Sequence, residues 1–355
     1  MADSKIRVLI IDDSAIARNT LTRILETDSK IEVVGTAPDA LIGLKKIRQL
    51  QPDVLTLDVE MPRMDGLSFL ERLMFSQPMP VVMVSAHTGE GSEAALKALE
   101  LGAVEIVEKP RIEVNKRLQE IALEITEKVK AAAIARLKNP QQRFQELVVP
   151  HKASRSLVPE VLWTNSPQII AIGASTGGTE VIREILSDLP AEMPGILITQ
   201  HMPKAFTSSF AKSLDRSAKI AVKEGEHRER LRPGLALLAP GEIHMRLQKD
   251  KVGFYVSLDD DPPINRHRPS IDALFGSVAS AVGENSIGVL LTGMGGDGAL
   301  GMQAMHRKGA WTIAQEESTC VVYGMPRVAV ELNAVNEVLK PEQIVDRLAS
   351  VCLQR

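Results

Sequence analysis

The sequence has little cysteine: its 355 residues include 2, Cys320 and Cys352. Two cysteines are too few for the disulfide framework of a small secreted scaffold, and they lack the C-x-x-C spacing of a structural zinc site. We therefore expect both thiols to fill space inside a protein of a reducing compartment.

Long hydrophobic runs are missing as well. No apolar stretch reaches the roughly 18 residues that a membrane-spanning helix needs. The first residues, MADSKIRVLIIDD, place charges before a short apolar run and contain no cleavage site of the kind that ends a secretory leader. These absences predict a cytoplasmic protein without a transmembrane segment.

Charge of one sign is not concentrated anywhere in the chain. The 42 Lys and Arg residues are balanced by 45 Asp and Glu residues, which gives a net charge of −3. A nucleic-acid-binding domain presents a concentrated basic face, so no nucleic-acid partner is expected. Internal repeats and low-complexity tracts are also lacking. The chain is instead long enough for two globular domains, each with its own core.

The first third of the chain alternates short β-rich apolar runs with amphipathic helical stretches. One such stretch is SAIARNTLTRILE, in which apolar side chains recur at helical spacing. Strands that alternate with helices are typical of a parallel sheet wound on both faces. The sequence therefore predicts a doubly wound α/β domain with five parallel strands, which are IRVLII, IEVVGTA, DVLTLD, PVVMVSA and AVEIVEK.

The middle of the chain changes character. Residues 112–138 have the pattern of one long helix, which Asn139 and Pro140 stop. The following residues, up to 165, hold three prolines and little periodicity, which is typical of a linker. A second α/β series starts at Pro167, and its expected strands are QIIAIGAS, GILITQHM, LALLAPG, GFYVSL, IGVLLTGMGG and WTIAQ. We expect a first domain over residues 1–125, a linker over 126–165 and a second, mostly parallel α/β domain over 166–355.

Side chains suited to phosphoryl chemistry stand at the ends of four strands of the first domain. They are Asp12, Asp13, Asp58, Ser85 and Lys109. The carboxyl ends of parallel strands meet at one edge of a sheet, where three carboxylates favour a hard cation such as Mg²⁺. Asp58 is then placed to accept a phosphoryl group whose charge the cation, Lys109 and Ser85 stabilise. A single strand-end aspartate is more often only solvated, but this ordered set predicts a site.

These residues make the segment up to about residue 125 resemble the receiver domains of response regulators. The matching motifs are DDS at 12–14, LDVEMPRMDG at 57–66, SA at 85–86 and KP at 109–110. The resemblance implies Mg²⁺ held by Asp13 and Asp58 with help from Asp12. It also implies phosphorylation of Asp58 by a partner histidine kinase and a cis peptide bond before Pro110. The chain departs from the family at Ile106, where receivers often carry an aromatic switch residue, while Ser85 can still follow the phosphate.

The second domain opens with the stretch IIAIGASTGGTE, in which an apolar strand runs into a turn of small residues. Residues 173–177 fit the G-x-S-x-G pattern, whose sharp strand-to-helix turn lifts the hydroxyl of Ser175 clear of the sheet. Backbone N–H groups at the start of the next helix can hold an oxyanion. A serine here is also a good helix N-cap, so the pattern alone leaves both interpretations open.

Two phosphate-binding alternatives fit this turn less well. A dinucleotide-binding loop needs G-x-G-x-x-G, but Ser175 occupies the place of the second glycine, and no acidic residue closes a neighbouring strand at the expected distance. A nucleoside-triphosphate loop needs a lysine before its Ser or Thr, and this turn has none.

A base and an acid for Ser175 follow neighbouring strands. His201 comes directly after the apolar run GILITQ, so its imidazole is expected at the same sheet edge. Asp297 lies in the glycine-rich turn TGMGGDG after the run IGVLL, where an aspartate is often only a turn former. His244 and His267 are second-choice bases. The chain order Ser, His, Asp differs from the order Ser, Asp, His of the α/β-hydrolases.

Several stretches make the second domain resemble the catalytic domain of the chemotaxis protein-glutamate methylesterases, the CheB family. They are IAIGASTGG, ITQHMP, HRPSIDALF, LLTGMGGDGA and YGMPRVAVE, and with the receiver they span nearly the whole chain in the family's order. The resemblance implies a serine esterase domain that needs no cofactor. Ser175 would be its nucleophile, His201 its base and acid, and Asp297 the orienting residue, with Thr176 and Met294 as oxyanion-site contributors.

The resemblance also implies the substrate and its control. The expected activity is hydrolysis of γ-glutamyl methyl esters, and deamidation of glutamines, on methyl-accepting chemoreceptors, through which alone the protein would reach the membrane. A chemotaxis histidine kinase would be the phosphodonor, and phosphorylation of Asp58 would release a docked arrangement that covers the active site.

Two rival functions belong to other classes. A receiver-controlled transcription factor needs a basic helix-turn-helix, which the acidic, strand-rich second half does not supply. In a docking adaptor without enzymatic activity, Ser175, His201 and Asp297 would be unrelated residues, so a reagent specific for activated serines would distinguish the two.

Overall fold

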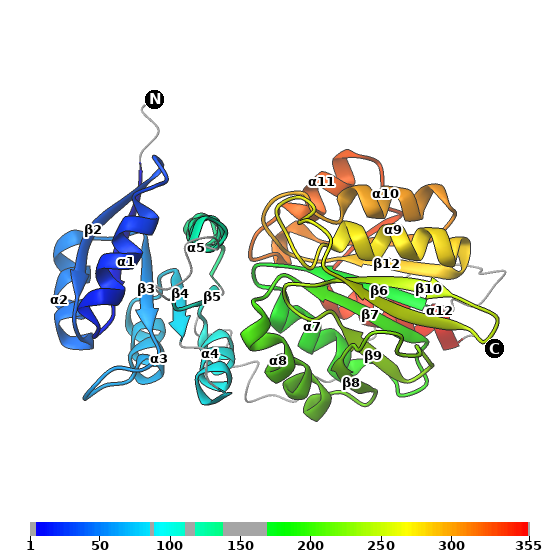
Figure 1. Ribbon diagram of the computed structural model, residues 1–355, viewed down its shortest axis with the longest axis horizontal. Coiled ribbons are helices and arrows are strands. Elements are labelled where there is room, and N and C mark those ends of the chain that lie inside the picture. Colours follow the sequence, from blue (N-terminus) through cyan, green and yellow to red (C-terminus); the bar gives the residue numbers. More distant parts are fainter. Residues whose placement is uncertain (1–4, 86–88, 111–117, 138–168, 354–355) are drawn as a thin grey trace. The chain divides into compact units, whose positions relative to one another are not determined.

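The computed structural model describes residues 5–85, 89–110, 118–137 and 169–353 of the chain. They divide into two compact units, one within residues 1–151 and the other within residues 152–355 (Figure 1). Most of the expected linker, from residue 138 to 165, lies outside the described residues.

The first unit is a five-stranded parallel sheet, as the sequence predicts, with the strand order β2-β1-β3-β4-β5. Its strands are β1 (Ile6–Ile11), β2 (Ile31–Ala37), β3 (Val54–Asp58), β4 (Val81–Ser85) and β5 (Glu105–Glu108). Every residue of β3 and β4 is buried. Helices cover both faces of a parallel sheet, so its inner strands are continuous apolar runs rather than alternating ones.

Helices pack on both faces of this sheet. They are α1 (Ala15–Leu25), α2 (Ala40–Leu50), α3 (Gly66–Ser76), α4 (Gly89–Leu101) and α5 (Leu118–Ala133). α1 contacts α5 on one face, and α3 contacts α4 on the other (Figure 1). The side chains of Ser14, Asp39 and Asp65 cap α1, α2 and α3, because each accepts a hydrogen bond from the backbone N–H three residues later.

Helix α5 is shorter than the helix expected over residues 112–138, and residues 111–117 lie outside the described part of the chain. Ile125, Val129 and Ala132 are buried, and α5 contacts α1 and the strands β3, β4 and β5. The helix therefore packs on the first unit beyond residue 125, because its apolar face continues to Ala133.

The second unit is built on a seven-stranded sheet in which all neighbouring strands are parallel, in the order β14-β13-β12-β6-β7-β9-β8. The strands are β6 (Ile169–Ala174), β7 (Gly195–Gln200), β8 (Ala221–Glu224), β9 (Leu235–Leu238), β12 (Ser286–Leu290), β13 (Trp311–Gln315) and β14 (Glu337–Leu339). The central strands β6, β7 and β12 are buried along their whole length. This confirms the predicted α/β class.

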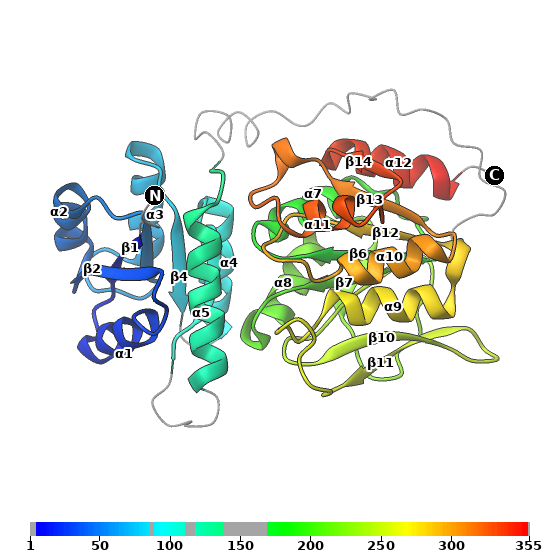
Figure 2. The same ribbon diagram turned by 90° about the horizontal axis from the view of Figure 1, so that it is seen from above.

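Helices again lie on both faces of the second sheet. They are α7 (Gly178–Asp188), α8 (Lys204–Ser217), α9 (Ile271–Ala281), α10 (Ala299–Arg307), α11 (Met325–Glu331) and α12 (Pro341–Leu353), with 3₁₀ turns η1 (Gly283–Asn285) and η2 (Glu317–Thr319). α9 contacts α10 on one face, and α7 contacts α8 and α12 on the other (Figures 1 and 2).

One strand pair stands apart from the large sheet. β10 (His244–Lys249) and β11 (Phe254–Asp259) form an antiparallel hairpin that packs against α9. Met245, Leu247 and Val256 point into the core of this unit and are buried. The stretch GFYVSL is therefore a strand, as expected, but it does not join the parallel series.

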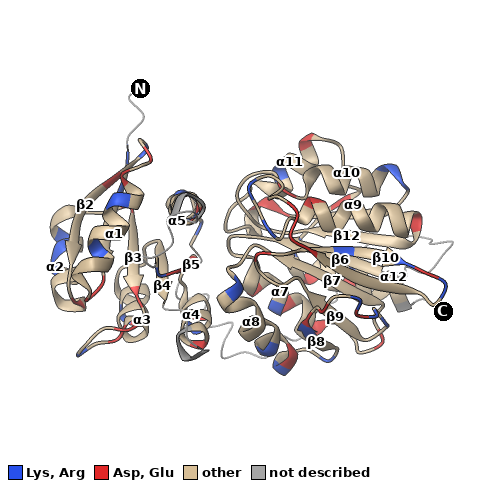
Figure 3. Cartoon of the chain, viewed as in Figure 1, with Lys and Arg blue, Asp and Glu red and all other residues tan. Residues whose placement is uncertain are grey.

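The remaining expectations from composition concern charge, membrane spans and cysteine. Lys and Arg residues are interspersed with Asp and Glu residues over both units (Figure 3). Within the described ranges, no helix combines the length and apolarity that crossing a bilayer requires. Both cysteines are free thiols; Cys320 is buried, and burial raises the pKa of the Cys352 thiol to about 12. The prediction that the cysteines fill space inside the protein is confirmed for Cys320, whereas Cys352 is half-buried.

Candidate active site

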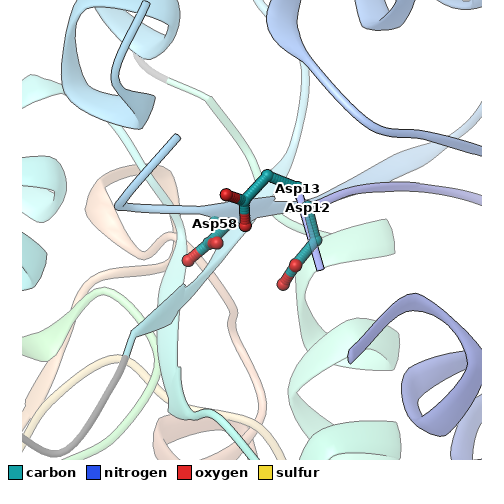
Figure 4. A group of neighbouring side chains, drawn as sticks. All are labelled: Asp12, Asp13 and Asp58. Carbon is teal, nitrogen blue, oxygen red and sulfur yellow. The ribbon is translucent and has the colours of Figure 1, made fainter. Parts of the chain in front are cut away.

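The acidic residues of the first unit meet at the carboxyl edge of its sheet. Asp12 and Asp13 follow β1, and Asp58 is the last residue of β3 (Figure 4). One carboxylate oxygen from each of the three lies within 4.8 Å of the others. Asp12 and Asp58 are buried, whereas Asp13 is exposed, so the cluster is accessible from solvent on the Asp13 side.

Lys109, directly after β5, pairs with the two buried carboxylates. Its Nζ lies 2.8 Å from Asp58 Oδ2 and 2.9 Å from Asp12 Oδ2. Burial lowers the pKa of Lys109, but the hydrogen bonds to both aspartates outweigh it and the net shift is upward. One ammonium cannot neutralise three carboxylates, so the site keeps negative charge that an oxygen-binding cation can balance.

Asp58 has the most perturbed carboxyl group of this edge. Burial raises its pKa to about 6; the hydrogen bond from Lys109 opposes the rise, and the charge of Asp12 adds to it. A cavity of about 650 Å³ opens beside Asp58, and its lining includes Asp13, Lys109 and Ala94. The buried carboxylate therefore faces a space large enough for a phosphoryl group.

The expected switch residues lie on the next two strands. Ser85 ends β4 and is fully buried, and its carbonyl accepts a hydrogen bond from the backbone N–H of Lys109 at 2.8 Å. This bond ties the ends of β4 and β5 together. Ile106 is buried within β5, where an aliphatic side chain fills the core.

The prediction of a cis peptide bond before Pro110 is wrong. Among the described residues, the one cis bond joins Arg268 to Pro269, so Lys109 and Pro110 are linked in trans. An X–Pro bond favours trans by about 0.5–1 kcal/mol unless its surroundings impose the other isomer.

In the second unit, Ser175 and His201 follow two paired strands. β6 and β7 are in register with Ala174 opposite Gln200, so the next residue of each strand emerges at the same edge. The His201 N–H donates to Ala174 O at 3.0 Å, and Gln200 Nε2 donates to Ser175 O at 2.9 Å. Ser175 and His201 are each 8% exposed, so both residues are almost fully buried at this edge of the sheet.

Ser175 is not the cap of the helix that follows it. The N-cap of α7 is Gly177, which makes no side-chain hydrogen bond and has φ of 77°. A Cβ at Gly177 would lie 2.4 Å from Val321 Cγ2, so both the backbone conformation and the close approach require glycine. The helix-cap interpretation of Ser175 is therefore wrong, and its hydroxyl is left for another role.

His201 and Asp297 form a buried pair. His201 Nε2 lies 2.9 Å from Asp297 Oδ2, and Asp297 is 2% exposed. Asp297 also accepts hydrogen bonds from Ser270 Oγ at 2.8 Å, Ile271 N at 2.7 Å and Asn265 Nδ2 at 2.9 Å. Burial alone would raise the pKa of Asp297, but these hydrogen bonds and the one from His201 hold it well below its usual range. Asp297 is therefore a carboxylate at neutral pH.

The second ring nitrogen of His201 faces no polar partner among the described residues. Nδ1 is buried and has no hydrogen-bond partner in the part of the chain that the structure describes. An ionised Asp297 accepts a hydrogen from Nε2, so the neutral ring carries its lone pair on Nδ1. This nitrogen is available to take a proton from a hydroxyl at the same edge.

The turn after β12 lies against Ser175. The Ser175 N–H donates to Thr292 O at 3.0 Å, and a Cβ at Gly293 would lie 2.7 Å from the Cβ of Ser175. Thr176, at the start of the neighbouring turn, is buried, and Met294 is half-buried. No residue in the described ranges accepts a hydrogen bond from the backbone N–H of Thr176 or Met294. Two donors are therefore available beside Ser175.

The two second-choice histidines have different surroundings. His244 is fully buried; its Nδ1 accepts from Ser270 N at 3.2 Å, and its Nε2 lies 3.2 Å from Pro262 O. Both ring nitrogens are engaged with backbone, so His244 is a structural residue. The His267 ring stacks on the ring of His201, with centroids 3.8 Å apart.

Sequence reasoning missed Asn265, Ser270 and the stacking of His267. These residues lie in the loop before α9, far along the chain from Ser175, and no strand or helix periodicity carries them. The only signal was the stretch HRPSIDALF, which matched a known family as a whole. Its first residue, His267, was expected only as a second-choice base, and Asn265 lies before the stretch.

Comparison with protein families agrees with the two units. Residues 170–348 match the model of the CheB methylesterase family, and residues 8–121 match that of the response regulator receiver domain. The catalytic domain of the Thermotoga maritima CheB methylesterase is a solved structure with 36% sequence identity and a TM-score of 0.51. The match covers 52% of this chain and 98% of that one.

Full-length relatives cover both units. The protein-glutamate methylesterase/protein-glutamine glutaminase of Salmonella typhimurium is 51% identical over 345 residues, which are 97% of this chain and 96% of the relative. A protein of the same description from Geobacter metallireducens is 50% identical over 349 residues, 98% of this chain and 96% of the relative. The chain thus belongs to the CheB family of response regulators, which join a receiver domain to a methylesterase domain.

Proposed function

We propose that the protein hydrolyses γ-glutamyl methyl esters, and deamidates selected glutamines, on chemoreceptors, with Ser175, His201 and Asp297 as its catalytic residues. The observation that carries this proposal is the buried 2.9 Å contact between His201 Nε2 and Asp297 Oδ2, at the edge where Ser175 emerges. It leaves Nδ1 of His201 as an unpartnered lone pair among the described residues. A docking adaptor has no need of such a pair.

The first step is acyl transfer to the serine. His201 Nδ1 takes the proton of the Ser175 hydroxyl as Oγ attacks the ester carbonyl. Asp297 does not accept this proton. It keeps Nε2 protonated and stabilises the imidazolium that forms, which its low pKa supports.

The negative charge that develops on the carbonyl oxygen needs donors already in place. The backbone N–H groups of Thr176 and Met294 are our candidates, because nothing in the described chain occupies them. Loss of one such donor typically slows acyl transfer about 10²- to 10³-fold.

The second half of the reaction releases the products. The imidazolium of His201 gives its proton to the leaving methoxide, so methanol departs and a glutamyl ester remains on Ser175. Water then attacks this acyl-enzyme, with His201 again as the base, and glutamate is released as the serine regains its proton. A glutamine follows the same course, with ammonia as the leaving group.

The receiver supplies control through Asp58. We propose that Asp58 takes a phosphoryl group from a chemotaxis histidine kinase, while Lys109 and the Ser85 hydroxyl contact its oxygens. Asp13 and Asp58, with help from Asp12, would hold Mg²⁺, and their oxygens within 4.8 Å of one another fit such an ion. When bound, Mg²⁺ neutralises charge on the transferring group.

The domain division is part of the same proposal. We assign residues 1–125 to the receiver, 126–165 to the linker and 166–355 to the methylesterase domain. Because the buried face of α5 packs on the first unit up to Ala132, the proposed end of the receiver moves from residue 125 to Ala133, and the linker then covers residues 134–165. The substrate receptors would be what brings a cytoplasmic protein of this kind to the membrane.

A serine-directed fluorophosphonate tests the catalytic assignment. We expect the whole chain to be labelled at Ser175, and we expect His201→Ala to lose nearly all labelling, since the reagent needs an activated hydroxyl. Ser187 is a matched control, because its Oγ only donates to the carbonyl of Glu184 at 3.0 Å within α7. Label spread over such serines, or none at Ser175, would support the adaptor instead.

A further inference from the structure

A tight turn, Ile264–His267, contacts both members of the His201–Asp297 pair. The ring of His267 lies flat on the ring of His201, with centroids 3.8 Å apart and planes 13° from parallel. Asn265 Nδ2 donates to Asp297 Oδ1 at 2.9 Å. One short turn therefore touches the base on its face and the acid on the oxygen that does not contact His201.

The backbone of this turn is built to present those two side chains. Ile264 and His267 exchange a pair of backbone hydrogen bonds of 2.8 and 3.1 Å. Between them, Asn265 and Arg266 have φ of 52° and 70°, and positive φ at both central residues is the mark of a type I′ turn. Side chains other than glycine and asparagine rarely adopt this conformation, so the surroundings must hold the turn in place.

His244 of β10 forms hydrogen bonds to the backbone on both sides of this turn. Its Nε2 contacts Pro262 O at 3.2 Å before the turn, and its Nδ1 accepts from Ser270 N at 3.2 Å after it. His244 is fully buried, and Ser270 in turn donates to Asp297. The turn is thus fixed to the same carboxylate and to the hairpin, and it has little freedom to move away from His201.

We propose that His267 is a positioning residue for His201, and that the turn exists to place its ring. This inference rests on the proposed role of His201 as the base. The stacked ring hinders rotation of the His201 imidazole about its Cβ–Cγ bond. Nε2 then stays on Asp297, and Nδ1 stays at the edge where Ser175 emerges. Asn265 supports the arrangement by fixing the orientation of the Asp297 carboxylate.

The proposal predicts a loss of turnover rather than of substrate binding. Without the flat ring, the His201 imidazole spends part of its time in orientations that cannot take the Ser175 proton. A stacked ring pair contributes enough that we expect His267→Ala to lower kcat about 2- to 10-fold. KM should be unchanged, since His267 would not touch the substrate in this role.

Three variants of the full-length protein separate stacking from mere volume. Methanol release from membranes bearing methylated receptors is measured for His267→Ala, His267→Leu and His267→Phe. We expect the Ala and Leu variants to lose kcat alike, because neither side chain is flat. Phe restores the planar contact, so its kcat should return to within about 2-fold of the wild type. Full activity of the Leu variant, or a Phe variant as impaired as Ala, would overturn the proposal.

A spectroscopic readout keeps the test independent of folding. The proton on His201 Nε2, hydrogen-bonded to a buried carboxylate, gives a far-downfield NMR signal that should broaden or vanish in the Ala and Leu variants and persist in Phe. An unchanged signal in all three contradicts positioning by stacking. Labelling of Ser175 by the fluorophosphonate is checked in parallel. If the wild type is not labelled, the proposed function fails. If the wild type is labelled and all three variants match it in kcat and NMR signal, only the inference about His267 fails.

Discussion

Asp297 joins three segments of the chain at a single side chain. Its two oxygens accept hydrogen bonds from His201 after β7, from Asn265 of the tight turn and from Ile271 at the start of α9. The N-terminus of a helix stabilises a carboxylate, and here it adds to three other donors. This explains how a buried acid keeps its charge and can hold the histidine in one tautomer.

Asp297→Asn should leave the fold intact and remove most of the activity. His201 Nε2 and Ile271 N both contact Oδ2, whereas Asn265 and Ser270 donate to Oδ1. An asparagine whose NH2 group takes the place of Oδ2 presents a donor to His201 and so favours the wrong tautomer of the ring. In serine hydrolases this change lowers kcat about 10⁴-fold. The check is methanol release by the variant at equal protein concentration, with circular dichroism to confirm folding. A loss of less than about 10-fold would remove Asp297 from the catalytic set.

Asp58 makes the stability of the receiver depend on pH, with a sign opposite to that of an aspartate whose pKa is lowered on folding. Its folded-state pKa is raised from 3.8 to about 6, so the folded protein binds this proton more tightly than the unfolded chain does. Stability of the receiver therefore falls as pH rises through this window, by up to about 3 kcal/mol. Asp58→Asn should consequently stabilise the receiver at pH 7 without Mg²⁺, and the gain should shrink toward pH 4.

Hydrogen exchange of receiver amides in the full-length chain measures this effect. Asp13→Asn is the matched control, because Asp13 is exposed at the same cluster and should change stability little. If Asp58→Asn exchanges faster than the wild type at pH 7, the raised pKa of Asp58 is contradicted.

The sequence predicts the single residues of both sites unevenly. Ser175, His201 and Asp297 could be found because each follows an apolar run, and the ends of parallel strands meet. Asn265 could not, and His267 was expected only as an alternative base, since a type I′ turn of Asn and Arg has no periodic pattern and its partners are distant in the chain. The helix-cap alternative for Ser175 also needed the structure, because Gly177 takes that place.

At the scale of elements, the turn after β12 packs directly against Ser175 and leaves no room for a side chain at Gly293. A Cβ at Gly293 would lie 2.7 Å from the Cβ of Ser175 and 2.5 Å from Met325 Sδ. The methionine can move, but the serine backbone is held by the hydrogen bond from Ser175 N to Thr292 O. The turn after β12 and the end of β6 therefore pack closely against each other.

Gly293→Ala should displace Ser175 and lower kcat about 10²-fold, since small displacements of reacting groups have effects of that size. Crowding should also destabilise the domain by about 1–3 kcal/mol. Gly276→Ala is the control: it lies within α9 with no atom within 4 Å of the added Cβ, and alanine there should stabilise by about 0.5–1 kcal/mol. Activity assays and thermal unfolding compare the two. Equal activity would show that the turn does not hold Ser175.

Which elements the sequence predicts follows from their composition. The central strands are uninterrupted apolar runs and were recognisable; WTIAQ, for example, is β13 with the same ends. Strands β8 and β10 were missed because AVKE and HMRLQK are half polar, and β14 because EVL is short. Edge positions and hairpins tolerate such residues, so local pattern carries little information there.

At the scale of the whole molecule, a receiver and an esterase share one chain. We expect the receiver to restrain the esterase until Asp58 is phosphorylated. A fragment that begins near Asn165 should therefore release methanol faster than the unphosphorylated whole chain. A small-molecule phosphodonor should raise the rate of the whole chain and leave the fragment unchanged. Equal rates for fragment and whole chain would argue against inhibition by the receiver.

The central claim is that Ser175 is the nucleophile of a methylesterase. Methanol release from methylated chemoreceptors by Ser175→Ala tests it most directly, with receiver phosphorylation by a phosphodonor as the internal control. Loss of a catalytic serine removes nearly all turnover, so we expect a fall of at least about 10³-fold while Asp58 is still phosphorylated. Methanol release near the wild-type rate by this variant would contradict the account.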